Sequence, residues 1–108
     1  MKEVRAYVHR MRVADVIAAI KDTPAFSGGR RNIALYVVKG MLTPLGKQEQ
    51  HYSLEVGDEI INEYKIEVLC EDVEADQIVD AMQRAGRTGQ YIAGWITVSD
   101  VERAIPIQ

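Results

Sequence analysis

Val4-Arg5-Ala6-Tyr7-Val8 is matched 62 positions later by Ile66-Glu67-Val68-Leu69-Cys70, and this pair of segments decides the fold. In both segments every second residue is small or branched and apolar, which predicts a strand with one buried face. Each strand is followed at the same offset by apolar side chains at i, i+3, i+4 and i+7, over residues 13–20 and 75–82. This period predicts two amphipathic helices, so the chain contains a structural duplication.

A second strand completes each half. Residues 33–38 and 95–98 are rich in β-branched and aromatic side chains, which favour strands. Residues that favour turns precede both strands: Pro24, Gly28 and Gly29 in the first half, and Gly86 and Gly89 in the second. The order β-α-β, a long connection, then β-α-β predicts an α+β fold, a ferredoxin-like split βαβ-βαβ sandwich with two helices on one face.

Length and composition narrow the class of protein. The 108 residues suit a single domain spanning 1–108, and 47% hydrophobic residues suffice for a packed core. No stretch approaches the roughly 18 apolar residues of a spanning helix. The charged start Met1–Arg5 does not resemble a signal peptide, so we expect a cytoplasmic protein without direct membrane insertion. The net charge of −3 disfavours a dedicated nucleic-acid binder.

The sheet face that the helices leave open is predicted to be apolar. Tyr7, Leu69, Trp95 and the branched residues of 33–38 would lie on it. Exposed apolar surfaces of that size usually mark an interface. We therefore expect the chain to oligomerise through this face.

The segment 40–63 is too long for an ordinary connection and is mostly polar. Two interpretations are open, a flexible insertion that tolerates change and an effector loop that engages a partner. Residues 52–56 alternate weakly in polarity, which is compatible with a hairpin.

The stretch Gly86-Arg87-Thr88-Gly89-Gln90-Tyr91-Ile92-Ala93-Gly94-Trp95-Ile96-Thr97-Val98 carries a family resemblance. It resembles the nucleotide-facing loop of the PII signalling proteins, written T-G-x-x-G-D-G-x-I. Thr88, Gly89, Gly94 and Ile96 match that pattern. Ile92, Ala93 and Trp95 stand where the family usually has glycine, aspartate and lysine.

Four further segments resemble PII proteins in the correct order. They are Lys39-Gly40 before the family's protruding T-loop, Lys65-Ile66-Glu67-Val68 in its third strand, Val98–Glu102 after the nucleotide-facing loop, and Ala104-Ile105 at the start of its terminal strand. The chain is identified as a divergent member of the PII superfamily. The resemblance implies a homotrimer with ligand clefts between subunits, and a T-loop at 40–63.

The resemblance also implies which residues bind an effector. They are Lys39, Gly40, Met41, Lys65, Arg87, Thr88, Gly89, Gln90, Ala93, Gly94, Trp95 and Arg103. Trp95, Pro106 and Gln108 occupy positions where the family has cations. Losing three cations weakens binding of the most highly charged ligand most, so we expect ADP or AMP rather than ATP, with bicarbonate as a candidate co-ligand.

Three aromatic residues, Trp95, Tyr91 and Tyr52, have more than one possible role. Trp95 is either a core or interface aromatic or a stacking platform for a planar group such as adenine, and the same holds for Tyr91. Tyr52 lies in the T-loop-like segment, where some PII relatives are modified. Its sequence context differs from the modified motif, so we expect it to be unmodified.

Metal and catalytic chemistry find little support in the sequence. His9, His51, Cys70, Glu71 and Asp72 do not have the spacing of a metal site, and Cys70 is expected to be a buried thiol. His51 is either solvated or a metal or pH-sensing residue. His9 and Glu71 hold equivalent positions in the two halves, and we expect them near each other at a strand end. No nucleophile motif is present, so we do not expect an enzyme.

The resemblance implies a regulatory function. An effector between subunits would order or release the 40–63 segment, which would then act on a membrane transporter, channel or metabolic enzyme. Some divergent branches are linked to inorganic-carbon handling or metal efflux. Two alternatives remain, a ligand-independent trimeric adaptor and a small acyl-phosphate hydrolase that grips phosphate through Arg12 beside a helix N-terminus.

Overall fold

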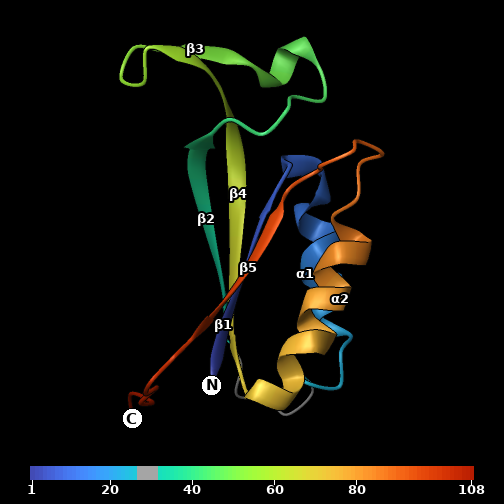
Figure 1. Cartoon of the computed structure of the whole chain (residues 1–108), viewed down its shortest axis with the longest axis vertical. Helices are drawn as coiled ribbons and strands as arrows, with labels where there is room; N and C mark the ends of the chain where they lie inside the picture. The colour runs from blue at the N-terminus through green and yellow to red at the C-terminus, as the bar shows by residue number, and fades with distance from the viewer. Residues whose placement is uncertain (27–31) are drawn as a thin grey trace.

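A computed structural model describes residues 1–26 and 32–108, so Gly28 and Gly29 of the expected turn lie outside the described residues. The first half contains β1 (Lys2–Val8), α1 (Val13–Lys21) and β2 (Ile33–Gly40). The second contains β4 (Asp58–Cys70), α2 (Ala75–Ala85) and β5 (Trp95–Asp100), and a short β3 (His51–Ser53) lies between the halves. The predicted duplicated order is confirmed (Figure 1).

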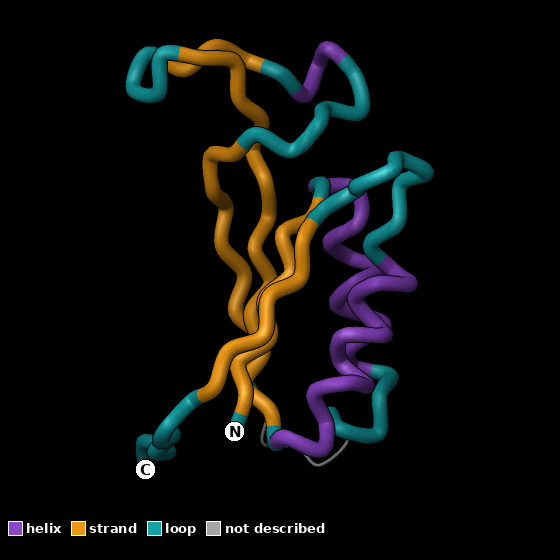
Figure 2. Tube along the Cα trace, viewed as in Figure 1, coloured by secondary structure: helices purple, strands orange, loops and turns teal. Residues whose placement is uncertain are grey.

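The sheet has the order β2-β4-β1-β5, with antiparallel pairing throughout. Each half is thus a split βαβ unit, because a strand of the other half lies between its two strands. Both helices cover the same face of the sheet, as Figure 2 shows. The α+β ferredoxin-like sandwich predicted from the sequence is the observed fold.

The core lies between the sheet and the helices. Its strand residues are the predicted inward sets: Val4, Ala6 and Val8 on β1, and Ile66, Val68 and Cys70 on β4. Of the predicted helix stripes, Val16 and Ile20 from α1 and Ala75, Ile78 and Met82 from α2 belong to the core, and Val13, Ile17 and Val79 are partly buried against it. Both sets are buried, and the Cys70 side chain is buried as expected.

The connection between the halves is shorter than the expected 40–63. Strand β4 begins at Asp58, and its first residues pair with β3 to form a hairpin that turns at Gly57, where φ is +74°. We call residues 41–57 the central loop. The early part of β4 escaped prediction because Ile60 and Ile61 are both buried, which interrupts the alternation of a strand.

Two expectations about the strand ends are wrong. Antiparallel pairing of Lys2 with Cys70 and Val8 with Tyr64 places His9 and Glu71 at opposite ends of the β1–β4 pair. Residues 103–108, which include the expected terminal strand at Ala104-Ile105, form no strand and are exposed. They extend away from the sheet in Figure 1, so their backbone finds no strand to pair with.

The open sheet face is less apolar than the sequence suggested. Tyr7 and Trp95 are cross-strand partners on it, and Tyr36 lies opposite Lys65, whose ammonium is 4.3 Å from the tyrosine ring centre. On β2, Ile33, Leu35 and Val37 lie opposite Val68, Ile66 and Tyr64 of β4. Directly paired residues point to the same face of a sheet, so these three face the helix side. Charged residues fill the middle of the open face: Glu3, Arg5, Lys65 and Glu67 form a connected set of ion pairs.

Candidate functional site

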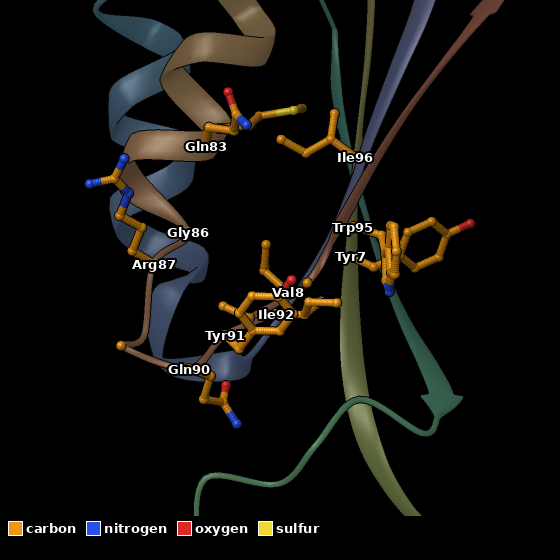
Figure 3. Close-up of a pocket in the computed structure, with 14 residues that line it drawn as sticks. Tyr7, Val8, Gln83, Gly86, Arg87, Gln90, Tyr91, Ile92, Trp95 and Ile96 are labelled. Carbon is orange, nitrogen blue, oxygen red and sulfur yellow. The ribbon is translucent and has the colours of Figure 1, made fainter.

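A cavity of about 470 Å³ lies beside the loop that joins α2 to β5. We call residues 86–94 the glycine-rich loop. Its residues form most of the wall, the end of α2 adds Met82 and Gln83, and the strands add Tyr7, Val8, Trp95 and Ile96 (Figure 3). The cavity therefore lies where a helix ends, a loop begins and two strands meet.

Two glycines give this loop its path, each for a different reason. A Cβ on Gly94 would stand 2.1 Å from the carbonyl oxygen of Tyr7, so the loop passes β1 at a distance that a side chain forbids. Gly89 has a φ of +90° in open space, a backbone conformation that favours glycine. Gly94 therefore allows a close passage beside β1, whereas Gly89 allows a left-handed backbone conformation.

The cavity is poor in charge. Among the described residues that line it, Arg87 is the one charged side chain, and it is exposed. In Figure 3 Arg87 lies on the α2 side, and Trp95 lies beside Tyr7 on the sheet side. Trp95 is 60% exposed, so in the single chain it is an open-face aromatic rather than a core residue.

Half of the residues predicted to bind an effector line this cavity. They are Arg87, Gly89, Gln90, Ala93, Gly94 and Trp95. Thr88 lies in the same loop, and its hydroxyl is bonded to the Gln90 side chain at 2.7 Å. The sequence did not select the strand and helix residues that complete the wall, such as Tyr7 and Gln83. The place of Tyr7 follows from the β1–β5 register, which pairs it with Trp95 and which the sequence alone does not give.

The remaining predicted residues lie elsewhere in the chain. Lys39, at the end of β2, pairs with Glu55 of the central loop at 3.2 Å, and Lys65 faces the open sheet with Glu67 at 3.7 Å. Met41 is 61% exposed at the start of the central loop, and Arg103 is exposed in the C-terminal tail. The structure does not bring these four residues to the cavity wall of the single chain.

Gly40 supports the base of the central loop. A Cβ there would lie 1.9 Å from a carboxylate oxygen of Glu63, which packs over the glycine. Glu63 is buried, and its Oε2 accepts the backbone N–H of Leu42 at 2.9 Å. This contact satisfies a buried N–H that the end of β2 leaves unpaired. The sequence did not single out Glu63, because a glutamate within a charged run is usually solvated.

A second anchor joins the central loop to the end of β1. His9 is fully buried, and its Nδ1 lies 2.9 Å from Oε2 of Glu49. Because a carboxylate only accepts, Nδ1 is the donor. Partial burial raises the pKa of Glu49, but the hydrogen bonds from His9 and from the Leu45 backbone N–H, with the charge of His9, outweigh it. The pKa of this carboxyl therefore lies below its ordinary value.

The arginine suggested for phosphate binding has a structural role. Nε of Arg12 donates to the carbonyl of Ala85 at 2.9 Å, and its guanidinium pairs with Asp15 at 3.0 Å. A cation on the last carbonyls of α2 stabilises that helix end. Over residues 1–26 and 32–108, no three His, Cys, Asp or Glu side chains are grouped to hold a metal ion. None of the helices in the same ranges is long and apolar enough to span a membrane.

Comparisons with known proteins agree on one family. The family model described as nitrogen regulatory protein P-II matches residues 1–108. The chain is 28% identical over 109 residues to the nitrogen regulatory protein P-II of Pyropia yezoensis, covering 100% of this chain and 92% of the relative. It is 30% identical over 112 residues to the protein of the same name from Bradyrhizobium diazoefficiens, with the same two coverages.

Proposed function

Because the chain belongs to the nitrogen regulatory protein P-II family, and is thus a signal-transduction regulator, we propose that it binds a small effector at the glycine-rich loop. The effector is an adenine nucleotide, ADP or AMP rather than ATP. Binding changes the conformation of the central loop, which corresponds to the family's T-loop. The loop then acts on a partner protein in the cytoplasm. No chemical step is part of this function.

One observation carries the choice of effector: among the described residues, Arg87 is the single cation in the cavity wall. Phosphate groups need backbone N–H groups or Lys and Arg side chains for each charge that they bring. Arg87 and the backbone N–H groups of the glycine-rich loop suit one phosphate better than three. The aromatic face of Trp95 or Tyr91 offers a surface on which a purine stacks.

Assembly into a trimer would complete the site. The open sheet face exposes Trp95 and Tyr36 beside paired charges, and this mixture of apolar and charged groups is typical of a specific protein interface. In such an assembly Lys39, Lys65 and Arg103 of a neighbouring subunit can approach the glycine-rich loop and add positive charge. These three residues do not line the cavity of a single chain, and in the proposed trimer they would bind the effector from the neighbouring subunit.

The tip of the central loop is the proposed contact with the partner. Leu54 is 91% exposed, and Tyr52 and Val56 are exposed beside it. Glu55, Asp58 and Glu59 surround these apolar side chains, so the tip is both apolar and acidic. Cytoplasmic loops of membrane transporters are rich in Lys and Arg, which complements this charge. The acidic tip therefore suits the basic cytoplasmic loops of a membrane transporter, and a metabolic enzyme with a basic pocket is the alternative partner.

Calorimetry with AMP, ADP and ATP, each with and without bicarbonate, tests the proposal. We expect binding of AMP or ADP that is tighter than binding of ATP, and loss of the signal in Arg87→Ala. Lys21→Ala, which removes an exposed cation at the end of α1 outside the cavity, serves as the control. Tight, ATP-selective binding would refute the choice of effector. No binding of any nucleotide, with partner capture by the loop tip intact, would favour the ligand-independent adaptor.

A further inference from the structure

The side chain of Gln90 joins the glycine-rich loop to the central loop. Its Nε2 donates to the carbonyl oxygen of Thr43 at 2.8 Å. Its Oε1 accepts from the hydroxyl of Thr88 at 2.7 Å, and that hydroxyl also accepts the backbone N–H of Gln90 at 3.3 Å. Thr88 therefore fixes the amide plane of Gln90 from within the glycine-rich loop, while the other end of the amide holds the central loop.

The other anchors of the central loop lie away from the cavity. Leu42 is bonded to the buried Glu63, and Glu49 is bonded to the buried His9, and none of these residues lines the cavity. Among the described cavity residues, Gln90 is the one with a hydrogen bond to the central loop. The Gln90 amide is therefore the hydrogen-bonded link between the described cavity wall and the central loop.

We propose that Gln90 is a positioning residue that couples occupancy of the cavity to release of the central loop at Thr43. The proposal rests on the proposed function, because it names how the effector site controls the loop. An anionic oxygen bound at the glycine-rich loop competes for the amide N–H of Gln90 and the hydroxyl of Thr88. A hydrogen bond to a charged acceptor is about twice as strong as one to a neutral carbonyl, so the amide turns from Thr43 to the ligand.

Release at Thr43 frees the loop only in part. The anchors at Glu63 and Glu49 remain, so the first half of the central loop opens while its base stays attached. Loss of one exposed hydrogen bond between neutral groups changes an opening equilibrium by about fivefold. This change is large enough to alter exposure of the segment near Thr43 and small enough to reverse when the ligand leaves.

Trypsin cleavage after Lys47 measures the opening. Lys47 is the only Lys or Arg between positions 41 and 57, and it is exposed next to the segment that Gln90 holds. Cleavage of a folded segment follows the population of its open form when opening is fast. Mass spectrometry of the Lys47–Gln48 bond therefore reports on the central loop alone.

The test compares Gln90→Met with wild type, and Gln83→Met is the matched control. Both substitutions keep an unbranched side chain on the cavity wall, but Gln83 lies on α2 and makes no hydrogen bond to the central loop among those of the described residues. Without ligand, we expect cleavage after Lys47 to be about fivefold faster in Gln90→Met and unchanged in Gln83→Met. Circular dichroism and the thermal midpoint of each variant show whether it is folded.

AMP is the probe for the second half of the test. Saturating AMP is expected to speed cleavage in wild type and to have no further effect in Gln90→Met, even when calorimetry shows that AMP binds there. A wild-type response to AMP in Gln90→Met would overturn the proposal. If no nucleotide binds wild type, the proposed effector is wrong, and the ligand-free comparison alone tests the contact between Gln90 and Thr43. Equal cleavage rates of Gln90→Met and Gln83→Met would then show that this contact does not hold the central loop.

Discussion

Gly94→Ala tests whether the path of the glycine-rich loop depends on a bare backbone. The new Cβ would lie 2.1 Å from the carbonyl oxygen of Tyr7 and 3.2 Å from its carbonyl carbon. Ordinary van der Waals contact begins near 3.4 Å. One of the two segments must therefore retreat by roughly 1.3 Å, which is the difference between 3.4 Å and the 2.1 Å to the carbonyl oxygen. The contacted atom belongs to a paired strand rather than to a flexible side chain, so it cannot simply turn away.

The cost has two parts. Overpacking against a rigid neighbour typically costs about 1–3 kcal/mol. Retreat of the loop also disturbs the adjacent Tyr7–Trp95 pair at the end of the β1–β5 ladder, where each lost backbone hydrogen bond costs about 1 kcal/mol. We therefore expect Gly94→Ala to lower the free energy of unfolding by about 2–4 kcal/mol. The cavity wall should move with the loop.

Urea unfolding at one fixed protein concentration measures this loss, and two other glycines are matched controls. Gly89→Ala meets nothing within 4 Å but keeps a φ of +90°, so it should cost only about 1–2 kcal/mol for the left-handed backbone. Gly46→Ala meets only the end of the Gln48 side chain, which can turn aside, and should be nearly neutral. If Gly94→Ala were as mild as Gly46→Ala, the argument from close approach would be wrong.

Three further predictions concern the anchors around the loop. Arg12→Gln removes the cation on the last carbonyls of α2 and should lower stability by about 1 kcal/mol in thermal unfolding, whereas Arg10→Gln should not. Glu63→Ala leaves a buried N–H unpaired and should cost about 1–3 kcal/mol, with faster amide exchange confined to the base of the central loop. The lowered pKa of Glu49 means that its anchor stabilises the loop above the ordinary range of a glutamate and is lost as pH falls through the lowered pKa. Amide NMR shifts of residues 42–50 should follow that acid transition in wild type and not in Glu49→Gln.

The sequence predicted those parts of the molecule that depend on local periodicity. The inward residues of β1 and β4 and the stripes of both helices follow periods of 2 and 3.6, and a side chain cannot leave such a pattern without exposing apolar surface. Family resemblance then located the glycine-rich loop. Its glycines have structural reasons that a sequence pattern suggests only in outline, as the different roles of Gly94 and Gly89 illustrate.

The sequence could not predict features that depend on register. His9 and Glu71 hold equivalent positions along the chain, but antiparallel pairing separates them, and His9 instead meets Glu49, which is 40 residues away. The sequence suggests that Glu63 is a surface charge, but in the fold it is buried against Gly40 of β2. The contact of Gln90 with Thr43 likewise joins two loops that share no motif. Such long-range polar contacts leave no period in the sequence, because each involves one residue rather than a repeated face.

In the glycine-rich loop the backbone path is constrained by a close approach, whereas several side chains are exposed. Gly94 must stay small because it passes the backbone of β1, and that constraint is independent of what the cavity holds. Positions such as Trp95 and Gln90 face outward or toward the central loop, where substitution costs the fold little. Charge can therefore be removed at one position and a loop contact placed at another without altering the path. In the proposed function Arg87 supplies charge to the effector, and Gln90 links the effector to the central loop. We therefore expect Arg87→Ala to lose effector binding, and Gln90→Met to keep binding but lose the response of the central loop.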